Sequence, residues 1–194
     1  QDATRDAGEQ DTDTSVSTGL NLKGGGSGEM SVGRQEHTAT LMDDGTVVII
    51  GGCCEFTKTR YAEAYYPGDG TWDLRGSLID VRWNHSATTI QGGNVLITGG
   101  DGEKQALSSA ELYDPSTGEF TATENLTEPR AGHSAVRLQD GRVLLVGGYG
   151  NEQNVLSTAE VYDPETGVFS NTGEMKRGRK NPTLALLKDG RVLV

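Results

Sequence analysis

The sequence predicts an all-β protein built from repeated four-stranded antiparallel meanders. A segment of about 20 residues occurs three times at a spacing of 48 residues, beginning at Arg34, Arg82 and Arg130. Glycine accounts for 28 of the 194 residues without a G-x-y period, which is typical of short strands joined by tight turns. Within each copy, strand-like runs alternate with turn sequences. A repeat of this length indicates a propeller or a solenoid.

The composition excludes some classes of partner. The formal net charge is -11 at pH 7, whereas nucleic acid and anionic membranes attract clustered Lys and Arg, so neither is an expected partner. No apolar stretch approaches the roughly 20 residues that a transmembrane segment needs. Cys53 and Cys54 are adjacent and lack a CxxC partner pair, so no zinc site is predicted. They are interpreted as partly buried thiols, with a vicinal disulfide or a bridge to residues beyond this chain as alternatives.

Residues 1–28 are predicted to form a disordered acidic tether rich in Ser, Thr and Gly. The segment has almost no large apolar side chains, so it cannot offset the entropy cost of ordering. Such segments commonly separate a cleaved signal or a lipid anchor from a folded domain. The expected localisation is therefore extracellular, periplasmic or on the cell surface.

From residue 29 onward the units follow one another without linkers, and each carries four strand-like segments. In the unit that begins at Arg130, the predicted strands are 133–138, 142–146, 159–162 and 168–172. Hairpin turns between the first and second strands are predicted at Asp44-Gly45, Gly92-Gly93, Asp140-Gly141 and Asp189-Gly190. The sequences DPSTG and DPETG predict turns between the third and fourth strands.

The units are expected at residues 30–78, 79–126, 127–175 and, as a partial unit, 176–194. The third unit has one extra residue after its Gly-Gly pair, so Arg179 follows Arg130 by 49 residues, and Pro182 replaces the repeated histidine. Three and a half units cannot close a ring, and open sheet edges invite pairing or aggregation. We therefore expect this sequence to be a fragment, with the remaining units in a longer chain or in a second chain.

Features shared by the units resemble the kelch repeat: an apolar strand ending in Gly-Gly, then a tyrosine, then an aromatic residue seven positions later. The aromatic pairs are Tyr65 with Trp72, Tyr113 with Phe120, and Tyr162 with Phe169. The sequence AELYDPSTGEF is most similar to kelch domains of exported bacterial proteins. This resemblance, within the galactose oxidase and kelch superfamily, implies a β-propeller of six or seven radial blades, of which the chain supplies an incomplete ring.

Residues that recur in the successive units are expected to build the scaffold, because each unit needs them. Beside the aromatic pairs they are His37, His85, His133, Gly51, Gly52, Gly99, Gly100, Gly147, Gly148, Glu63, Glu111 and Glu160. Histidine also serves as a metal ligand or a base, but equivalent positions in successive units favour a structural role here. The glutamates are predicted to accept hydrogen bonds from the repeated arginines or from backbone amides, since a buried carboxylate needs a partner.

Variable loops on one face of the scaffold are the predicted ligand site. In an up-and-down blade, the second-to-third loops and the blade-to-blade loops share a face, and here they carry the variation between units. The candidate ligand-binding residues are Arg34, Phe56, Arg82, Trp83, Arg130, Tyr149 and Arg179. Aromatic rings supply flat contact surfaces, and guanidinium groups bind carboxylates. In some kelch propellers such arginines capture an acidic peptide, a role that competes here with pairing to the repeated glutamates.

The predicted function is a non-catalytic binding platform for a protein or carbohydrate ligand. The family resemblance supplies one alternative, a fragment of a galactose-oxidase-like copper radical oxidase, in which tyrosines and histidines hold the metal and one tyrosine is cross-linked to a cysteine. No such set can be carried over residue by residue. No catalytic residue, metal ligand or cofactor is therefore predicted, with copper expected only under that alternative. The other alternative is a structural propeller module of a larger surface protein.

Overall fold

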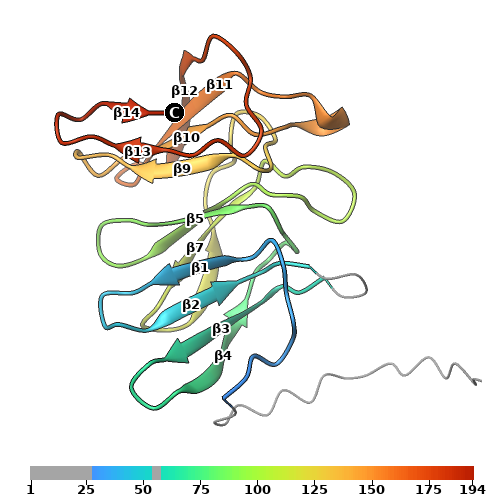
Figure 1. The fold of residues 1–194 in the computed structure, drawn as a ribbon, viewed down its shortest axis with the longest axis vertical. Coiled ribbons are helices and arrows are strands. Elements are labelled where there is room, and N and C mark those ends of the chain that lie inside the picture. Colours follow the sequence, from blue (N-terminus) through green and yellow to red (C-terminus); the bar gives the residue numbers. More distant parts are fainter. Residues whose placement is uncertain (1–27, 54–57) are drawn as a thin grey trace, which may run out of the picture.

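The computed structural model describes residues 28–53 and 58–194 of the chain. The predicted tether lies outside the described residues except for Gly28, and Cys54 and Phe56 also lie outside them. The described residues form three four-stranded sheets and a two-stranded one, which follow one another along the long axis of the molecule (Figure 1). This arrangement confirms the predicted all-β fold, and the described residues do not close the ring.

Each sheet is one blade, with its strands in chain order. The first blade contains β1 (Thr38–Leu41), β2 (Val47–Ile50), β3 (Tyr61–Tyr66) and β4 (Thr71–Ser77). The second contains β5 (Ser86–Thr89), β6 (Val95–Thr98), β7 (Ala110–Asp114) and β8 (Glu119–Ala122). The third contains β9 (Ser134–Arg137), β10 (Val143–Val146), β11 (Thr158–Asp163) and β12 (Val168–Glu174). The fourth sheet is a hairpin of β13 (Ala185–Leu186) and β14 (Val192–Leu193).

The strand ends of the third blade differ from the predicted ends by one or two residues, for local reasons. The predicted first strand began at 133, but the side chain of His133 leaves the sheet to bond hydroxyl groups of the second blade. The strand stops before Leu138, whose N–H donates to the carbonyl of Arg142 and closes the hairpin at 2.7 Å. At the outer edge, β12 runs on to Glu174 because it pairs with Thr158 across a register shift.

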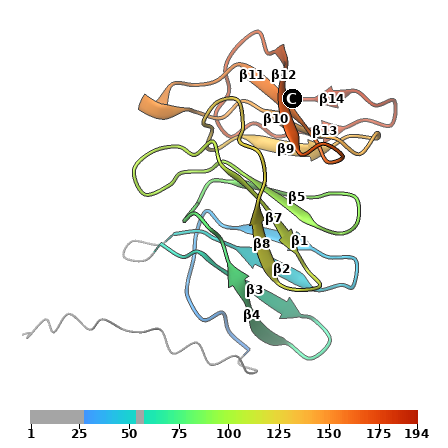
Figure 2. The same cartoon turned by 180° about the vertical axis from the view of Figure 1, so that it is seen from behind.

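The first strands of the blades lie together on the inside of the ring. Strand β1 contacts β5, β5 contacts β9, and β9 contacts β13. Figure 2 shows the same succession of sheets from behind, with β4 at the far end of the first blade. This order matches radial propeller blades whose innermost strand is the first in the chain.

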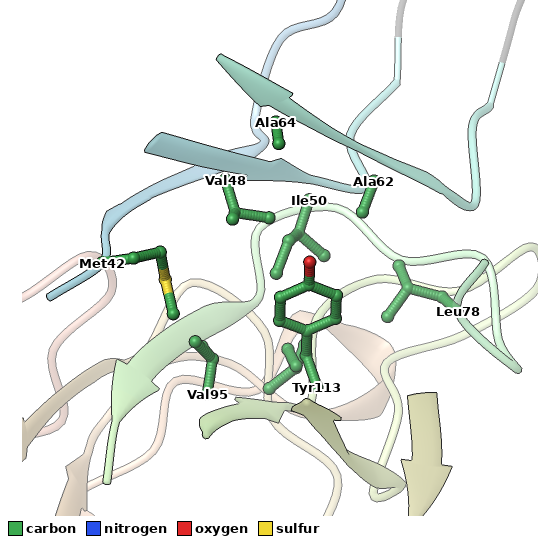
Figure 3. Close-up of a cluster of buried hydrophobic side chains, with 9 residues drawn as sticks. Met42, Val48, Ile50, Ala62, Ala64, Leu78, Val95 and Tyr113 are labelled. Atoms are coloured by element: carbon green, nitrogen blue, oxygen red, sulfur yellow. The ribbon is translucent and has the colours of Figure 1, made fainter. Parts of the chain in front are cut away.

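The hydrophobic core lies between successive blades. Figure 3 shows the first such cluster, in which Ile50 and Ala62 of the first blade face Val95 and Tyr113 of the second. The ring of Tyr113 is only 1% exposed, and its equivalent Tyr162 fills the same place between the second and third blades. Each blade therefore buries one face against its neighbour, so a single blade would lack a complete core.

The repeated aromatic pairs fasten the third strand of each blade to the fourth. Tyr65 lies opposite Trp72, Tyr113 opposite Phe120, and Tyr162 opposite Phe169 in the strand registers. Their ring centroids are 4.9, 4.8 and 4.7 Å apart, with tilted planes. Cross-strand aromatic pairs of this kind stabilise a sheet beyond their buried area.

The Gly-Gly pairs join each blade to the next through the backbone. The N–H groups of Gly52, Gly100 and Gly148 donate to the carbonyl groups of Arg82, Arg130 and Arg179 at 3.0, 2.9 and 2.8 Å. The approach is so close that a Cβ atom on Gly99 would lie 2.2 Å from the carbonyl oxygen of Arg130. Glycine is therefore required where the second strand of one blade meets the entry to the next.

Candidate functional site: the loop face

The second-to-third loops and the blade-to-blade segments lie at one face of the blades, as predicted, and they also pair with one another there. In the second blade, Trp83 forms a β-bridge with Asp101, which bridges in turn to Ala106. The equivalent bridges join Ala131 to Tyr149 and Tyr149 to Val155, and join Gln35 to Cys53 and Cys53 to Lys58. We call this side of the blades the loop face, and the opposite side, which carries the Asp-Gly hairpins, the turn face.

A cavity of about 670 Å³ opens on the loop face between the second and third blades. We call it the loop-face pocket. Its walls are Trp83 and the loops 101–106 and 150–153. Polar side chains dominate the lining: they are those of Asp101, Glu103, Lys104, Gln105, Asn151, Glu152 and Gln153. The volume lies within the range of roughly 300–1,000 Å³ that is usual for small-molecule sites.

A second cavity of about 420 Å³ lies on the other side of the same loop. Its lining includes Ile79, Val81 and Leu107 together with the cationic side chains of Arg60 and Lys104. The loop that follows Asp101 therefore forms a ridge between two hollows on the loop face. Among the predicted ligand-binding residues that the structure describes, which exclude Phe56, only Trp83 lines either hollow.

Trp83 is half-buried, and a lysine side chain lies over one face of its indole ring. The ammonium group of Lys58, from the first blade, lies 4.9 Å from the centroid of that ring. A cation at this distance over an indole face is attracted by the ring electrons. The contact holds the ring between the first blade and the loop-face pocket.

Tyr149 occupies a different position from the one its sequence suggested. The prediction gave it a flat surface for ligand contact, but the residue is only 4% exposed, because Gly132 leaves space for its ring. A Cβ atom on Gly132 would lie 2.8 Å from that ring. The ammonium group of Lys180 lies 3.9 Å from the ring centroid and covers the ring further. What Tyr149 offers to the site is therefore its hydroxyl group.

The hydroxyl of Tyr149 joins a polar cluster that links the third blade to the second. It donates to Oδ2 of Asp101 at 2.5 Å, and the amide of Asn84 donates to the same oxygen at 3.1 Å. Burial and the Asp101 carboxylate raise the pKa of Tyr149, so its hydroxyl keeps its proton and remains a donor at physiological pH. Sequence reasoning selected Trp83 and Tyr149 on these variable segments for their aromatic rings but not Asp101 or Asn84, because only the fold brings those two side chains to the Tyr149 hydroxyl.

The loop 150–153 has an unusual backbone. Glu152 and Gln153 are consecutive and both have left-handed conformations, with φ of 59° and 60°. They lie in the 3-10 turn η1 (Asn151–Gln153). This turn is irregular, because the backbone of Glu152 is not helical. Left-handed backbone costs energy in residues other than glycine and asparagine, and such strain is found most often at functional sites.

The repeated arginines pair with the repeated glutamates, as one of the two competing predictions stated. Nη2 of Arg82 donates to Glu111 at 2.7 Å, and Nη1 donates to the carbonyl groups of Gly99 and Ser109 at 2.7 and 3.0 Å. Arg34 with Glu63, and Arg130 with Glu160, form the same pair. Each glutamate also accepts N–H bonds from the segment that precedes its arginine, donated by Ser31, Ile79, Asp80 and Thr127.

Burial removes these arginines from the loop face. The side chains of Arg34, Arg82 and Arg130 are all 0% exposed, so their guanidinium groups are not accessible to a ligand. The predicted ligand-binding role therefore does not fit these three positions. Arg179 is exposed, and the described residues contain no carboxylate paired with it.

Two of the repeated histidines, His85 and His133, are buried between blades. Nε2 of His85 lies 3.0 Å from the hydroxyl of Thr38, and Nε2 of His133 lies 3.0 Å from that of Ser86. Each ring thus reaches a first-strand hydroxyl group of the preceding blade. Burial, and secondarily the neighbouring arginines, lower the pKa of His85 and of His133 to about 3, so both rings are neutral.

The described residues do not fit a copper centre of the galactose oxidase kind. Tyr113 and Tyr162 are enclosed in the core between blades, and His85 and His133 are bonded to hydroxyl groups. Within the described ranges, no group of three His, Cys, Asp or Glu side chains is placed to hold a metal ion.

Comparison with known proteins identifies the repeat. Residues 82–127 and 129–176 each match the family described as Kelch motif. The solved structure of YjhT is similar to this chain, with a TM-score of 0.66 and 14% sequence identity over 76% of this chain. The second and third blades are kelch repeats.

The similarity to YjhT concerns the fold alone, given the low identity. The kelch chain spans about half of YjhT, since the match covers 54% of that protein. No curated protein matches the kelch chain in sequence. Among its described residues, no helix is long and apolar enough to cross a membrane.

The buried histidines of the kelch blades predict a loss of stability in mild acid. An unfolded histidine titrates near pH 6.5, whereas His85 and His133 have pKa values of about 3 in the folded chain. Between these values the unfolded state binds protons that the folded state does not, so stability falls as the pH falls below 6.5. Each histidine is expected to contribute about 1 kcal/mol per pH unit.

Urea unfolding at pH 7.5, 6.5 and 5.5 measures this loss. The double variant His85→Gln, His133→Gln keeps hydrogen-bonding side chains at both positions but removes the titration. It should show a shallower dependence of unfolding free energy on pH than the parent chain. An equal slope in the two proteins would contradict the assignment.

Proposed function

We propose that the kelch chain is a binding platform whose ligand, a protein or a carbohydrate, is recognised on the loop face. The observation that carries the proposal is the loop-face pocket, in which Trp83 stands beside two polar loops from adjacent blades. An aromatic side chain surrounded by convergent polar groups is a usual composition of a recognition site. A kelch fold supports such a binding or scaffold role in general.

Two further observations favour this place. The scaffold uses the repeated residues for ion pairs and backbone contacts, so the pocket is built from residues that differ between blades. The strained loop 150–153 forms one of its walls, and the third blade carries its extra residue in the same region. The composition of residues 1–28 supports placing this platform outside the cell, on a tether.

Replacing Trp83 with alanine tests the proposal. The protein should be applied to arrays of immobilised glycans and of peptides, and the bound ligand should then be titrated. We expect Trp83→Ala to weaken binding at least tenfold, because a single aromatic anchor often carries much of the binding energy of a site. The melting temperature serves as the check on folding.

Leu41→Ala is the matched control. Leu41 is an apolar residue that is 68% exposed, and it lies where β1 approaches the turn face. This variant should bind like the parent chain. Unchanged binding by Trp83→Ala would refute the pocket as the recognition site.

A further inference from the structure

Three sets of equivalent positions on the loop face differ between blades although their backbones agree. The residue after each repeated arginine is Gln35, Trp83, Ala131 or Lys180. The next residue is Glu36, Asn84, Gly132 or Asn181, all left-handed with φ between 51° and 56°. The first residue after each Gly-Gly pair is Cys53, Asp101 or Tyr149. The fold accepts very different side chains at each of these positions. The scaffold therefore does not explain which side chain a given blade carries there.

In the second and third blades these variable positions converge on one carboxylate. Asp101 receives hydrogen bonds from Tyr149 and Asn84, and both reach its Oδ2 atom. Asn84 also lies 3.3 Å from the hydroxyl oxygen of Tyr149, which closes the cluster. Two donors from two blades therefore fix the orientation of one side chain.

The second oxygen of Asp101 takes no part in this cluster. Asp101 lines the loop-face pocket, and no group among the described residues bonds its Oδ1 atom. Its backbone exchanges two hydrogen bonds with that of Trp83. The N–H of Trp83 donates to the carbonyl of Asp101 at 3.1 Å, and the N–H of Asp101 donates to the carbonyl of Trp83 at 2.7 Å. The arrangement places a fixed hydrogen-bond acceptor next to an aromatic ring at the edge of the same cavity.

We propose that Asp101 is the residue that determines specificity in the loop-face pocket, and that the ligand is a neutral carbohydrate; this inference rests on the proposed function. A sugar ring presents an apolar C–H face, which packs against the indole of Trp83, and hydroxyl groups, which donate to Oδ1. Tyr149 and Asn84 are positioning residues, because they hold the carboxylate through its other oxygen. Hydrogen bonds to ionised groups are stronger than those between neutral groups, so a carboxylate held in one orientation can bind a hydroxyl group firmly.

The lining of the pocket favours a neutral sugar over an anionic sugar or an apolar peptide. Three carboxylates line it, from Asp101, Glu103 and Glu152, against one ammonium group, from Lys104. An anionic ligand would meet this excess of negative charge. Apart from Trp83, Ala106 is the only apolar side chain in the lining, so an apolar peptide anchor would find few contacts. Amide and carboxylate groups instead match a ligand rich in hydroxyl groups.

Tryptophan fluorescence provides a direct test. The chain has two tryptophans, so the variant Trp72→Phe leaves Trp83 as the reporter in the pocket. Probes are the methyl glycosides of glucose, galactose, mannose and N-acetylglucosamine, with methyl glucuronide as the anionic comparison. We expect a saturable change in fluorescence with at least one neutral glycoside and weaker binding of the glucuronide.

Variants in the same background test the roles of the individual residues. Asp101→Asn is expected to weaken binding at least tenfold, and Tyr149→Phe and Asn84→Gly about threefold to tenfold each. Glycine suits the backbone at position 84, because Gly132 has a φ of 56° at the equivalent position and Asn84 has 51°. Asn181→Gly, at the same register position but without a hydrogen bond to Asp101 or Tyr149 among the described residues, is the control and should bind normally.

Deoxy analogues of the bound glycoside distinguish ligand contact from a structural effect. Removing the hydroxyl group that donates to Asp101 should weaken binding to the parent protein, yet should weaken binding to Asp101→Asn little further. A merely structural role for Asp101 would give independent losses with every analogue.

The outcomes separate this inference from the proposed function. It is overturned if no glycoside changes the fluorescence, if the glucuronide binds best, or if Asp101→Asn binds like the parent. A ligand that depends on Trp83 but proves to be a peptide would also overturn it, while leaving the binding platform intact. Binding that does not depend on Trp83 would remove both proposals.

Discussion

Replacing Arg130 with methionine is expected to lower the free energy of unfolding by about 3–5 kcal/mol. Both Nε and Nη2 of Arg130 donate to Glu160, at 3.0 and 2.6 Å, and the two side chains are 0% exposed. Without the guanidinium group, a buried carboxylate loses its counter-charge. The carbonyl group of Gly147 also loses a donor at 2.9 Å. Urea denaturation at pH 7.5 measures the change.

Arg142→Met is the matched control for this experiment. Arg142 pairs with Asp140 at 2.7 Å, but the two side chains are 49% and 50% exposed, so solvent screens the interaction. Removing an exposed pair is expected to cost less than about 1 kcal/mol. Similar losses in the two variants would show that the buried pair does not hold the blade together.

Replacing Gly99 with alanine is the second substitution with a large expected effect. The residue has a φ of +56°, and its new Cβ atom would lie 2.2 Å from the carbonyl oxygen of Arg130 in the next blade. Left-handed backbone costs about 1–2 kcal/mol in alanine, and overpacking costs about 1–3 kcal/mol, so a total loss of about 2–5 kcal/mol is expected. Thermal and urea unfolding both report it.

Gly93→Ala separates these two contributions. Gly93 has a φ of +87° in the hairpin on the turn face, and a Cβ atom there would meet no atom within 4 Å. This variant should show the backbone cost alone. If Gly99→Ala were no worse than Gly93→Ala, the close contact between blades would not be what requires glycine.

The sequence was sufficient to predict the blades because repetition marks the residues that every blade needs. A tyrosine and an aromatic residue seven positions later fix the register of the third and fourth strands, as Tyr113 and Phe120 do in the second blade. Likewise, each blade repeats the Gly-Gly pair because the next blade approaches it too closely for a side chain. Strand ends were less predictable, since they depend on side chains such as His133 that leave the sheet for a neighbouring blade.

The site was less predictable, because its residues occur once. Sequence reasoning selected Trp83 for its aromatic ring but had no signal for Asp101, whose orientation depends on a tyrosine 48 residues away. It could not decide whether the repeated arginines are exposed, since that depends on how strands 29 or 30 residues later fold back onto them. Comparing the blades marks positions 84 and 101 as variable, but only the fold shows that Asn84 and Tyr149 meet at the Asp101 carboxylate.

The small bridges that close each second-to-third loop have a consequence for how the protein can change. Cys53 with Lys58, Asp101 with Ala106, and Tyr149 with Val155 each clamp the base of one loop. The third loop is one residue longer than the second, yet β10 and β11 keep the same pairing as β6 and β7. A loop can thus gain a residue without changing the strand pairing of its blade, so we expect the residues between these bridges to tolerate substitution while the blade stays the same.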